Sequence, residues 1–291
     1  MKNILVIGGG AMGSAFTIPC IDNKNKVTIT EPYSKLFIKN LSSKTKNHSS
    51  LKIKMPKQLI FKNYSNELFR EKYDLIVIAL SLSGIDFIGK ELKKYKIKSP
   101  ILILTKGLKY EKKKKKIFTI SEQFKKNYNV SNISILKGPC LAKELARKNQ
   151  TSVIVANKNI NLAKKIGKMI STKYYIIEFS KDIIGIEVCS AIKNIYSMII
   201  GAGQSLNASS NLFQKSVIEM GYLIKYFKGK EETTLGLAGI GDLYVSAAGG
   251  RNSKMGSYLG RRFTFKTEKK NLCPMILLKV NSLHERLLHI F

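Results

Sequence analysis

The amino-acid sequence predicts an α/β protein: a doubly wound sheet at the N-terminus, followed by a mainly α-helical C-terminal domain. Three observations support this: short apolar runs typical of buried parallel strands, helix-length stretches between them, and purely helical spacing after about residue 180. We therefore expect a sheet domain over residues 1–180 and a helical domain over residues 181–291. The expected strands are residues 3–7, 27–30, 74–80, 100–104, 133–136, 152–156 and 174–179.

Helices are expected where apolar residues recur at a spacing of three and four. The first domain has such patterns at residues 14–21, 85–95 and 117–128, and the lysine run 112–116 is interpreted as the solvated start of the last of these. The second domain has them at residues 182–203 and 212–227.

The composition limits the class of protein. The chain has 291 residues, of which 44% are hydrophobic, and this is enough for two buried cores. Its net charge of +32 would attract polyanions, but lysines predominate and no nucleic-acid-binding motif accompanies them. We therefore interpret the charge as a lysine-rich surface. The four cysteines are widely spaced, which indicates a reducing cytosol and neither a disulfide framework nor a metal site. We expect no membrane span and no signal peptide.

A glycine-rich loop follows the first strand. Gly8 permits a tight turn, Gly10 allows the backbone to approach a pyrophosphate, and Gly13 allows the next helix to lie close to the strand. The helix N-terminus then favours the phosphates. Glu31 ends the second strand, where a carboxylate bonds an adenosine ribose and repels a 2′-phosphate. The sequence thus predicts a dinucleotide site that favours NAD over NADP.

Four further stretches place polar residues after strands or within apolar helices. Together they supply two lysines, an aspartate and an Arg-Asn pair, which suit an anionic carbonyl compound. They are Thr105–Leu108, Gly138–Glu144, Glu187–Asn194 and Gly236–Leu243, the last of which leads to Ser246 and to Gly249–Asn252.

In order and spacing, these stretches and the glycine loop resemble the NAD-dependent glycerol-3-phosphate dehydrogenase family over roughly residues 1–260. The resemblance implies a Rossmann-like domain followed by a helical one. It also implies a cytoplasmic enzyme that interconverts dihydroxyacetone phosphate and sn-glycerol 3-phosphate for phospholipid synthesis. A homodimer is one oligomeric state that we consider.

Carried over by position, the resemblance implies roles for individual residues. Lys193 would be the general acid–base, Asp242 would orient it, and Lys106 would polarise the substrate carbonyl. Arg251 and Asn252 would hold the phosphate. The remaining implied substrate contacts are Lys106, Gly138, Cys140, Ser246 and Gly250; the implied cofactor contacts are Gly8, Gly10, Ala11, Met12, Gly13, Glu31, Lys106, Ala142 and Arg251.

The sequence departs from the family pattern at four places. The turn after the strand that ends at Leu80 lacks the usual proline. Cys140 stands where Ser or Thr is usual, and Gly250 stands where bacterial members often have Ser. Residues 261–291 contain no glycine and lack the acidic Glu-Gly motif that closes over the cofactor. Our hypothesis is that this segment is truncated or read out of frame.

Three other functions compete with an active enzyme. The first is a catalytically impaired remnant that still binds dinucleotide. The second is a related 3-hydroxyacid or 6-phosphogluconate-type dehydrogenase, which fits the glycine loop but not Lys106, Asp242 and the Arg-Asn pair together. The third is a basic nucleic-acid-binding protein.

Overall fold

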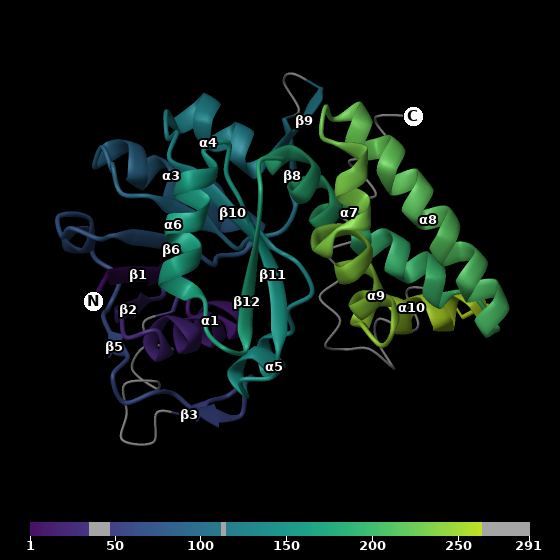
Figure 1. Cartoon of the computed structure of the whole chain (residues 1–291), viewed down its shortest axis with the longest axis horizontal. Coiled ribbons are helices and arrows are strands. Elements are labelled where there is room, and N and C mark those ends of the chain that lie inside the picture. The colour runs from purple at the N-terminus through teal and green to yellow at the C-terminus, as the bar shows by residue number, and fades with distance from the viewer. Residues whose placement is uncertain (35–46, 112–114, 264–291) are drawn as a thin grey trace. The chain divides into compact units, whose positions relative to one another are not determined.

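The computed structural model describes residues 1–34, 47–111 and 115–263, which form two compact units (Figure 1). The first unit comprises residues 1–106 and 120–183, and the second comprises residues 107–119 and those from 184 onwards. The predicted domain at residues 1–180 included residues 107–119, which this division groups with the second unit.

The first unit contains the large sheet and its covering helices. Its strands are β1 (Asn3–Ile7), β2 (Lys26–Thr30), β3 (Asn47–His48), β4 (Ile53–Lys54), β5 (Ile60–Phe61), β6 (Leu75–Ile78), β7 (Ile101–Ile103), β10 (Ile133–Lys137), β11 (Thr151–Ala156) and β12 (Tyr175–Ser180). Its helices are α1 (Ala11–Asp22), α3 (Ile85–Lys94), α4 (Ile120–Tyr128), α5 (Ala142–Ala146) and α6 (Ile160–Ile170), with 3-10 turns η1 (Asn66–Phe69) and η2 (Leu82–Gly84).

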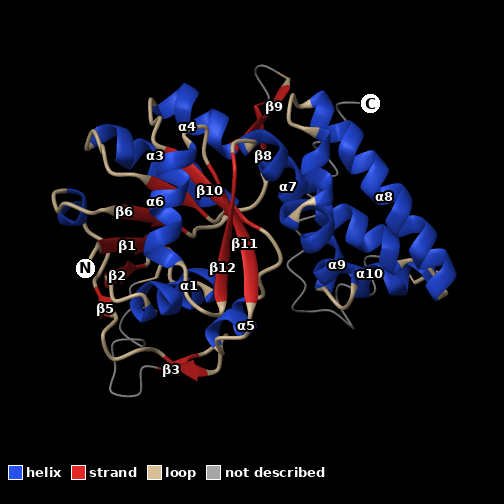
Figure 2. Ribbon diagram, viewed as in Figure 1, coloured by secondary structure: helices blue, strands red, loops and turns tan. Residues whose placement is uncertain are grey.

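The second unit is mainly helical, as Figure 2 shows. Its elements are β8 (Leu108–Glu111), β9 (Lys116–Thr119), α7 (Ile183–Gly201), α8 (Leu206–Tyr226), η4 (Glu231–Leu235), η5 (Leu237–Gly241), α9 (Asp242–Ala247) and α10 (Arg251–Gly260). Helices α7 and α10 cross closely because small residues lie at the crossing. A Cβ at Gly201 would lie 2.1 Å from the carbonyl oxygen of Ser253, and one at Gly256 would lie 1.9 Å from that of Met198.

The main sheet has the order β12-β11-β10-β7-β6-β1-β2-β5. All neighbours are parallel except β10 and β11, which run antiparallel. Every strand expected from the sequence is present, so the predicted doubly wound sheet is confirmed. Because β1, β6, β7 and β10 are mutually parallel, the loops that follow them meet at one edge, which is where such sheets bind ligands.

Both faces of the sheet are buried. On one face, Ile4 and Val6 share a core with Phe16 of α1 and Ile166 of α6. On a strand, alternate side chains point to opposite faces. Leu5, which points the other way, is also fully buried, as expected for a parallel sheet covered by helices on both sides.

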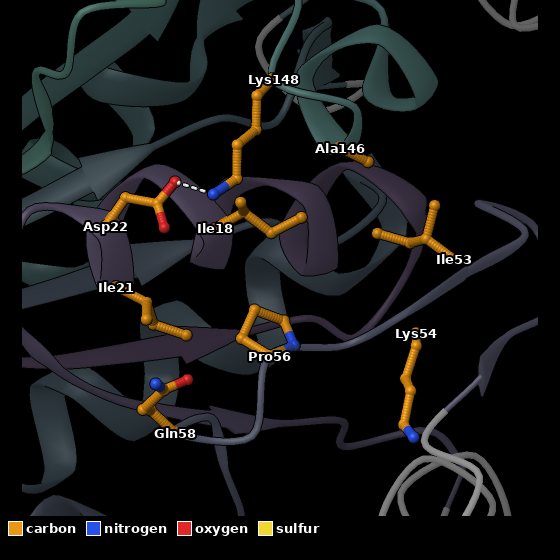
Figure 3. A pocket seen from close by; sticks show the side chains of 9 residues that line it. All are labelled: Ile18, Ile21, Asp22, Ile53, Lys54, Pro56, Gln58, Ala146 and Lys148. Carbon is orange, nitrogen blue, oxygen red and sulfur yellow. Dashed lines mark ion pairs between the residues drawn. The ribbon is translucent and has the colours of Figure 1, made fainter.

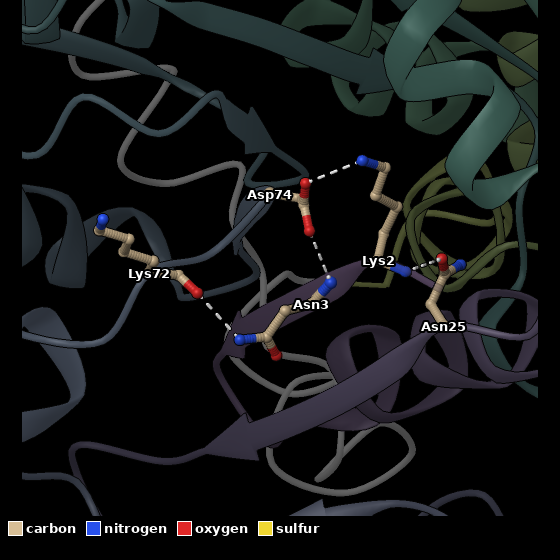
Figure 4. Close-up of polar contacts among 5 residues, drawn as sticks. All are labelled: Lys2, Asn3, Asn25, Lys72 and Asp74. Atoms are coloured by element: carbon tan, nitrogen blue, oxygen red, sulfur yellow. Dashed lines mark hydrogen bonds and ion pairs between the residues drawn. The ribbon is translucent and has the colours of Figure 1, made fainter.

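One carboxylate fixes the start of β1 (Figure 4). Asp74 Oδ2 accepts a hydrogen bond from the backbone N–H of Asn3 at 2.9 Å, and Oδ1 accepts one from Lys2 Nζ at 3.1 Å. The backbone hydrogen bond from Asn3 is the largest cause that lowers the pKa of Asp74, followed among the lowering contributions by Lys2. Asn3 also donates to the carbonyl of Lys72 at 2.9 Å. These contacts hold β1 in register with β6, so the glycine loop starts from a fixed position.

One helix prediction was wrong at its start. The segment Lys116–Thr119 is strand β9, which pairs antiparallel with β8, and helix α4 begins only at Ile120. Ile117, Phe118 and Thr119 are β-branched or aromatic, and residues of these types favour strands. Pairing with β8 places them in one. Lys116 therefore begins a strand rather than the turn before a helix, while residues 112–114 lie outside the described residues.

Candidate active site

The predicted dinucleotide loop follows β1. Gly8 has φ +119°, and a Cβ there would lie 2.6 Å from the carbonyl oxygen of Ala79, so both conformation and space require glycine. Its N–H donates to the carbonyl of Thr30 at 2.9 Å. Gly10 is the N-cap of α1, and no side chain of the described residues caps that helix end. Ala11, Met12 and Gly13 thus form an uncapped first turn, which favours an anion.

Two glycines of the loop differ in what surrounds them. A Cβ at Gly13 would lie 1.9 Å from the carbonyl oxygen of Gly8, so Gly13 allows α1 to pack against the loop. A Cβ at Gly10 would meet no atom of the described residues within 4 Å. Gly10 therefore borders open space, which fits a backbone that a dinucleotide approaches.

Glu31 lies directly after β2 and is bound to the loop. Its Oε2 accepts the N–H of Gly9 at 2.8 Å, and its Oε1 accepts the N–H of Tyr33 at 2.9 Å. The carboxylate is therefore held against the loop, in the position expected for a ribose-binding acid.

Two more side chains hold the Gly9 carbonyl. Ser14 Oγ donates to it at 2.8 Å, and His48 Nε2 lies 3.2 Å from it. Sequence reasoning missed His48, because a lone histidine in a polar segment carries no pattern that relates it to a loop 39 residues away.

The loop after β7 carries Lys106. Thr105 Oγ1 donates to the carbonyl of Leu80 at 2.8 Å, and the ammonium of Lys137 donates to the carbonyl of Thr105 at 2.5 Å. Lys137, which is buried at the end of β10, was also missed. The sequence signal for Lys137 was a charged residue at the end of an otherwise apolar strand. Such a group is buried only with partners, so the pattern indicates a buried polar contact.

The loop after β10 carries the next predicted residues. Gly138 has φ +125°, and a Cβ added there would lie 3.2 Å from the Cα of Val153. Cys140 is half-buried against the core, and Ala142 begins α5. The predicted site residues of this unit all follow strands that end at the same edge of the sheet: the glycine loop, Lys106, Gly138, Cys140 and Ala142.

In the second unit, three predicted residues form a cluster around a buried ion pair. Lys193 of α7 makes an ion pair with the Asp242 carboxylate, and it donates to Ser246 Oγ at 2.7 Å. The two paired side chains are only 8% and 3% exposed. We call Lys193, Asp242 and Ser246 the lysine cluster. Asp242 and Ser246 are four residues apart, so they lie on the same face of α9.

A glycine-rich turn delivers Asp242 to this cluster. The π-helical turn η5 precedes α9 directly, and a Cβ at Gly239 would lie 2.0 Å from the carbonyl oxygen of Thr234. Only glycine permits that close packing of η5 on η4. The motif at residues 236–241 therefore has a structural reason: it places α9 so that Asp242 faces α7.

The Arg251-Asn252 pair occupies the first turn of α10. Gly250 is the N-cap of this helix, and no side chain of the described residues caps it. A Cβ at Gly250 would lie 2.3 Å from the carbonyl oxygen of Ser246, which explains glycine at this position. A ten-residue helix with an uncapped start and an exposed arginine is suited to phosphate.

Helix α7 is long and apolar enough to cross a membrane by length and composition alone. However, 67% of its most apolar window is buried, and Lys193 within it is paired. Among the described residues it is the one helix that passes this test, and its burial is that of a core helix of the second unit.

A cavity of about 420 Å³ lies elsewhere in the first unit (Figure 3). It is lined by Ile18, Ile21 and Asp22 of α1 together with Ile53, Lys54, Pro56, Gln58, Ala146 and Lys148. Lys148 pairs with Asp22 at its rim at 2.8 Å. None of the site residues predicted from the sequence lines it.

The parallel sheet with its glycine loop, and the helical unit with its buried lysine, define the class of two-domain dinucleotide-dependent oxidoreductases. Comparison with known families narrows this class. Residues 3–163 match the model of the NAD-dependent glycerol-3-phosphate dehydrogenase N-terminus, and residues 182–285 match that of its C-terminus. The chain belongs to this family.

Individual relatives agree with this assignment. The chain is 30% identical to an NADP(+)-dependent glycerol-3-phosphate dehydrogenase of Archaeoglobus fulgidus, over 89% of this chain and 80% of that one. It is 29% identical to a glycerol-3-phosphate dehydrogenase [NAD(P)+] of Clostridium botulinum, over 89% of this chain and 79% of that one. The crystal structure of the Coxiella burnetii glycerol-3-phosphate dehydrogenase has the same fold, with a TM-score of 0.83 at 22% identity, covering 99% of this chain and 89% of that one.

The C-terminal match reaches residue 285, beyond Gly260, where the resemblance noted in the sequence ended. Residues 264–291 lie outside the described residues. The hypothesis of a truncated or out-of-frame tail therefore stays a prediction.

Proposed function

We propose that this protein catalyses the NAD-dependent interconversion of dihydroxyacetone phosphate and sn-glycerol 3-phosphate in the cytoplasm, and so supplies glycerol phosphate for phospholipid synthesis. The observation that carries the proposal is the buried ion pair of Lys193 and Asp242 within the lysine cluster. Burying a charged ammonium is costly unless it is paired, and an apolar core helix gains no stability from one. A catalytic task explains its presence.

The residues of the chain have separate roles in the proposed reaction. The nicotinamide, when bound, supplies the hydride that reaches C2 of the substrate. Lys193 gives a proton to the C2 oxygen as that oxygen gains negative charge, and solvent later returns a proton to the amine. In the reverse direction, Lys193 takes the proton from the hydroxyl. A positioned acid–base of this kind contributes about 10²–10⁴-fold to rate.

The partners of Lys193 hold its Nζ in place. The Asp242 carboxylate and the Ser246 hydroxyl both bond Nζ, so the proton donor has one position rather than the several that a flexible lysine samples. Asp242 also balances the charge of the ammonium. The role proposed for Ser246 is therefore positioning as well as substrate contact.

Other proposed roles follow from charge and place. Lys106 polarises the carbonyl. Arg251 and Asn252 bind the phosphate at the start of α10, where the guanidinium fork and the helix N-terminus both favour an anion. Gly138, Cys140 and Gly250 line the substrate site, and Ala142 contacts the cofactor together with the loop Gly8–Gly13.

Glu31 supports NAD as the cofactor. A carboxylate fixed at the end of β2 repels the 2′-phosphate of NADP and can accept hydrogen bonds from ribose hydroxyls. We accordingly propose NAD as the preferred cofactor and NADP as the less favoured one.

The direct test is oxidation of NADH by the purified full-length chain, with dihydroxyacetone phosphate as substrate and NADPH as the parallel cofactor. We expect substrate-dependent oxidation that is faster with NADH. NADH binding without turnover would identify the catalytically impaired protein instead. Oxidation of NADH with a 3-oxoacid but not with dihydroxyacetone phosphate would overturn the substrate assignment. The oligomeric state, for which we propose a homodimer, is measured by light scattering on the same sample.

A further inference from the structure

The two peptide groups that flank the Cα of Gly9 are held by three side chains from three separate segments. The N–H of Gly9 donates to Glu31 Oε2 at 2.8 Å, at the end of β2. Its carbonyl accepts Ser14 Oγ at 2.8 Å, from within α1, and meets His48 Nε2 at 3.2 Å, from β3. The peptide groups on both sides of the Gly9 Cα are thus fixed, one at its N–H and the other at its carbonyl oxygen.

The ring of His48 has a defined tautomer. Its Nδ1 accepts the backbone N–H of Leu51 at 3.2 Å, so the proton of the neutral ring lies on Nε2, which donates to the Gly9 carbonyl. His48 as a whole is 1% exposed. Burial lowers the pKa of His48, and this favours the neutral ring that the geometry requires.

The orientation of these two peptide groups affects the glycines on both sides of Gly9. Three consecutive glycines have more backbone freedom than any other tripeptide, and ordering them costs conformational entropy. Gly8 on one side has a positive φ, and Gly10 on the other begins α1 next to open space. A loop that is ordered before the dinucleotide arrives loses less entropy when it binds.

We propose that His48 is a positioning residue of the dinucleotide site, which orders the glycine loop by donating from Nε2 to the Gly9 carbonyl and so strengthens dinucleotide binding. This inference rests on the proposed function. The alternative is that His48 serves only to anchor the small β3–β4 pair, and then it would affect stability without affecting binding.

The test compares variants that separate the donor from the ring. H48F keeps a ring of similar size but has no donor, whereas H48Q offers an amide N–H near the position of Nε2. Asn25→Ala is the matched control, because Asn25 donates to the carbonyls of Cys20, near the C-terminal end of α1, and Met169 of α6. The probe is NADH, titrated by its fluorescence, together with kcat and KM for both substrates and the thermal midpoint of each variant.

We expect H48F to raise the Kd for NADH about 3- to 10-fold, the size of one lost hydrogen bond, with kcat and the KM for dihydroxyacetone phosphate unchanged. H48Q should recover most of the affinity, and Asn25→Ala should lower the thermal midpoint while leaving the Kd unchanged. S14A, which removes the other donor to the same carbonyl, should weaken NADH binding in the same way, and it extends the test if H48F does not fold.

Two results would overturn the inference: an H48F protein that binds NADH as tightly as the wild type, or, if H48F is unfolded, an S14A protein that does so. These are distinct from failure of the proposed function, in which the wild-type chain itself binds no NADH.

Discussion

The glycine loop of the first unit and the lysine cluster of the second are built in opposite ways. The loop is a contiguous run, Gly8 to Gly13, and it works through backbone conformation and the space that missing side chains leave. The lysine cluster joins side chains 49 and 53 residues apart and works through a charge buried by packing.

This difference determines which substitutions damage each site. The loop depends on local φ values and a close helix–strand contact, so an added methyl group damages it. The cluster depends on a compensated charge in a low-dielectric interior, so removing one partner leaves the other buried without compensation. Four predictions test this contrast, in order of decreasing effect.

The largest effect is expected for Lys193→Ala. Turnover should fall about 10²–10⁴-fold because the positioned proton donor is lost. The Kd for NADH should stay unchanged, since the glycine loop belongs to the other unit. Lys225→Ala is the matched control, because Lys225 is an exposed lysine on α8. Steady-state rates and NADH fluorescence titration measure both quantities, and a Lys193→Ala protein with near wild-type turnover would refute the assigned acid–base role.

Asp242→Asn should destabilise the chain by about 3–5 kcal/mol, because the buried ammonium of Lys193 loses its counter-charge. Urea unfolding measures the change. The control is Asp74→Asn, whose ion pair with Lys2 is partly exposed and should contribute less than about 1 kcal/mol. Equal losses in the two variants would mean that burial does not distinguish the two pairs.

Gly13→Ala and Gly10→Ala should separate packing from binding within one loop. In Gly13→Ala, the new Cβ overlaps the carbonyl oxygen of Gly8, and we expect a loss of about 1–3 kcal/mol of stability. Gly10→Ala should change stability by less than about 0.5 kcal/mol, because its Cβ meets open space. Its affinity for NADH should nevertheless fall. Thermal melts and NADH titration on both variants check this pattern. If Gly10→Ala lost stability and Gly13→Ala lost only NADH affinity, the packing role would belong to Gly10 and the binding role to Gly13.

The smallest effect is expected from the titration of His48. Because burial lowers its pKa in the folded protein below the unfolded value of 6.5, the unfolded chain takes up a proton first as the pH falls. The stability from the neutral ring is therefore complete above about pH 6.5, and it declines as the pH falls from there through the lowered pKa. The wild type and H48Q are compared by urea unfolding across this range. A difference between them that stays constant with pH would contradict the neutral buried ring.

The sequence alone determined the parts that depend on local rules. The short apolar runs predicted the strands, and the spacing of Gly8, Gly10 and Gly13 predicted a tight turn, an open backbone and a close helix contact. The structure bears out each of these geometries. These features follow from the chain's own stereochemistry over a few residues, and so they can be read without knowing the rest of the fold.

Tertiary structure alone decided the pairings between distant segments. Only the fold shows that Ser246 also bonds Lys193, that β11 runs antiparallel to β10, and that Lys137 bonds the backbone carbonyl before Lys106. It also turned residues 116–119 into a strand and brought His48 to Gly9. The physical reason is common to all of them: a hydrogen bond or ion pair between remote residues depends on packing, which no local pattern encodes.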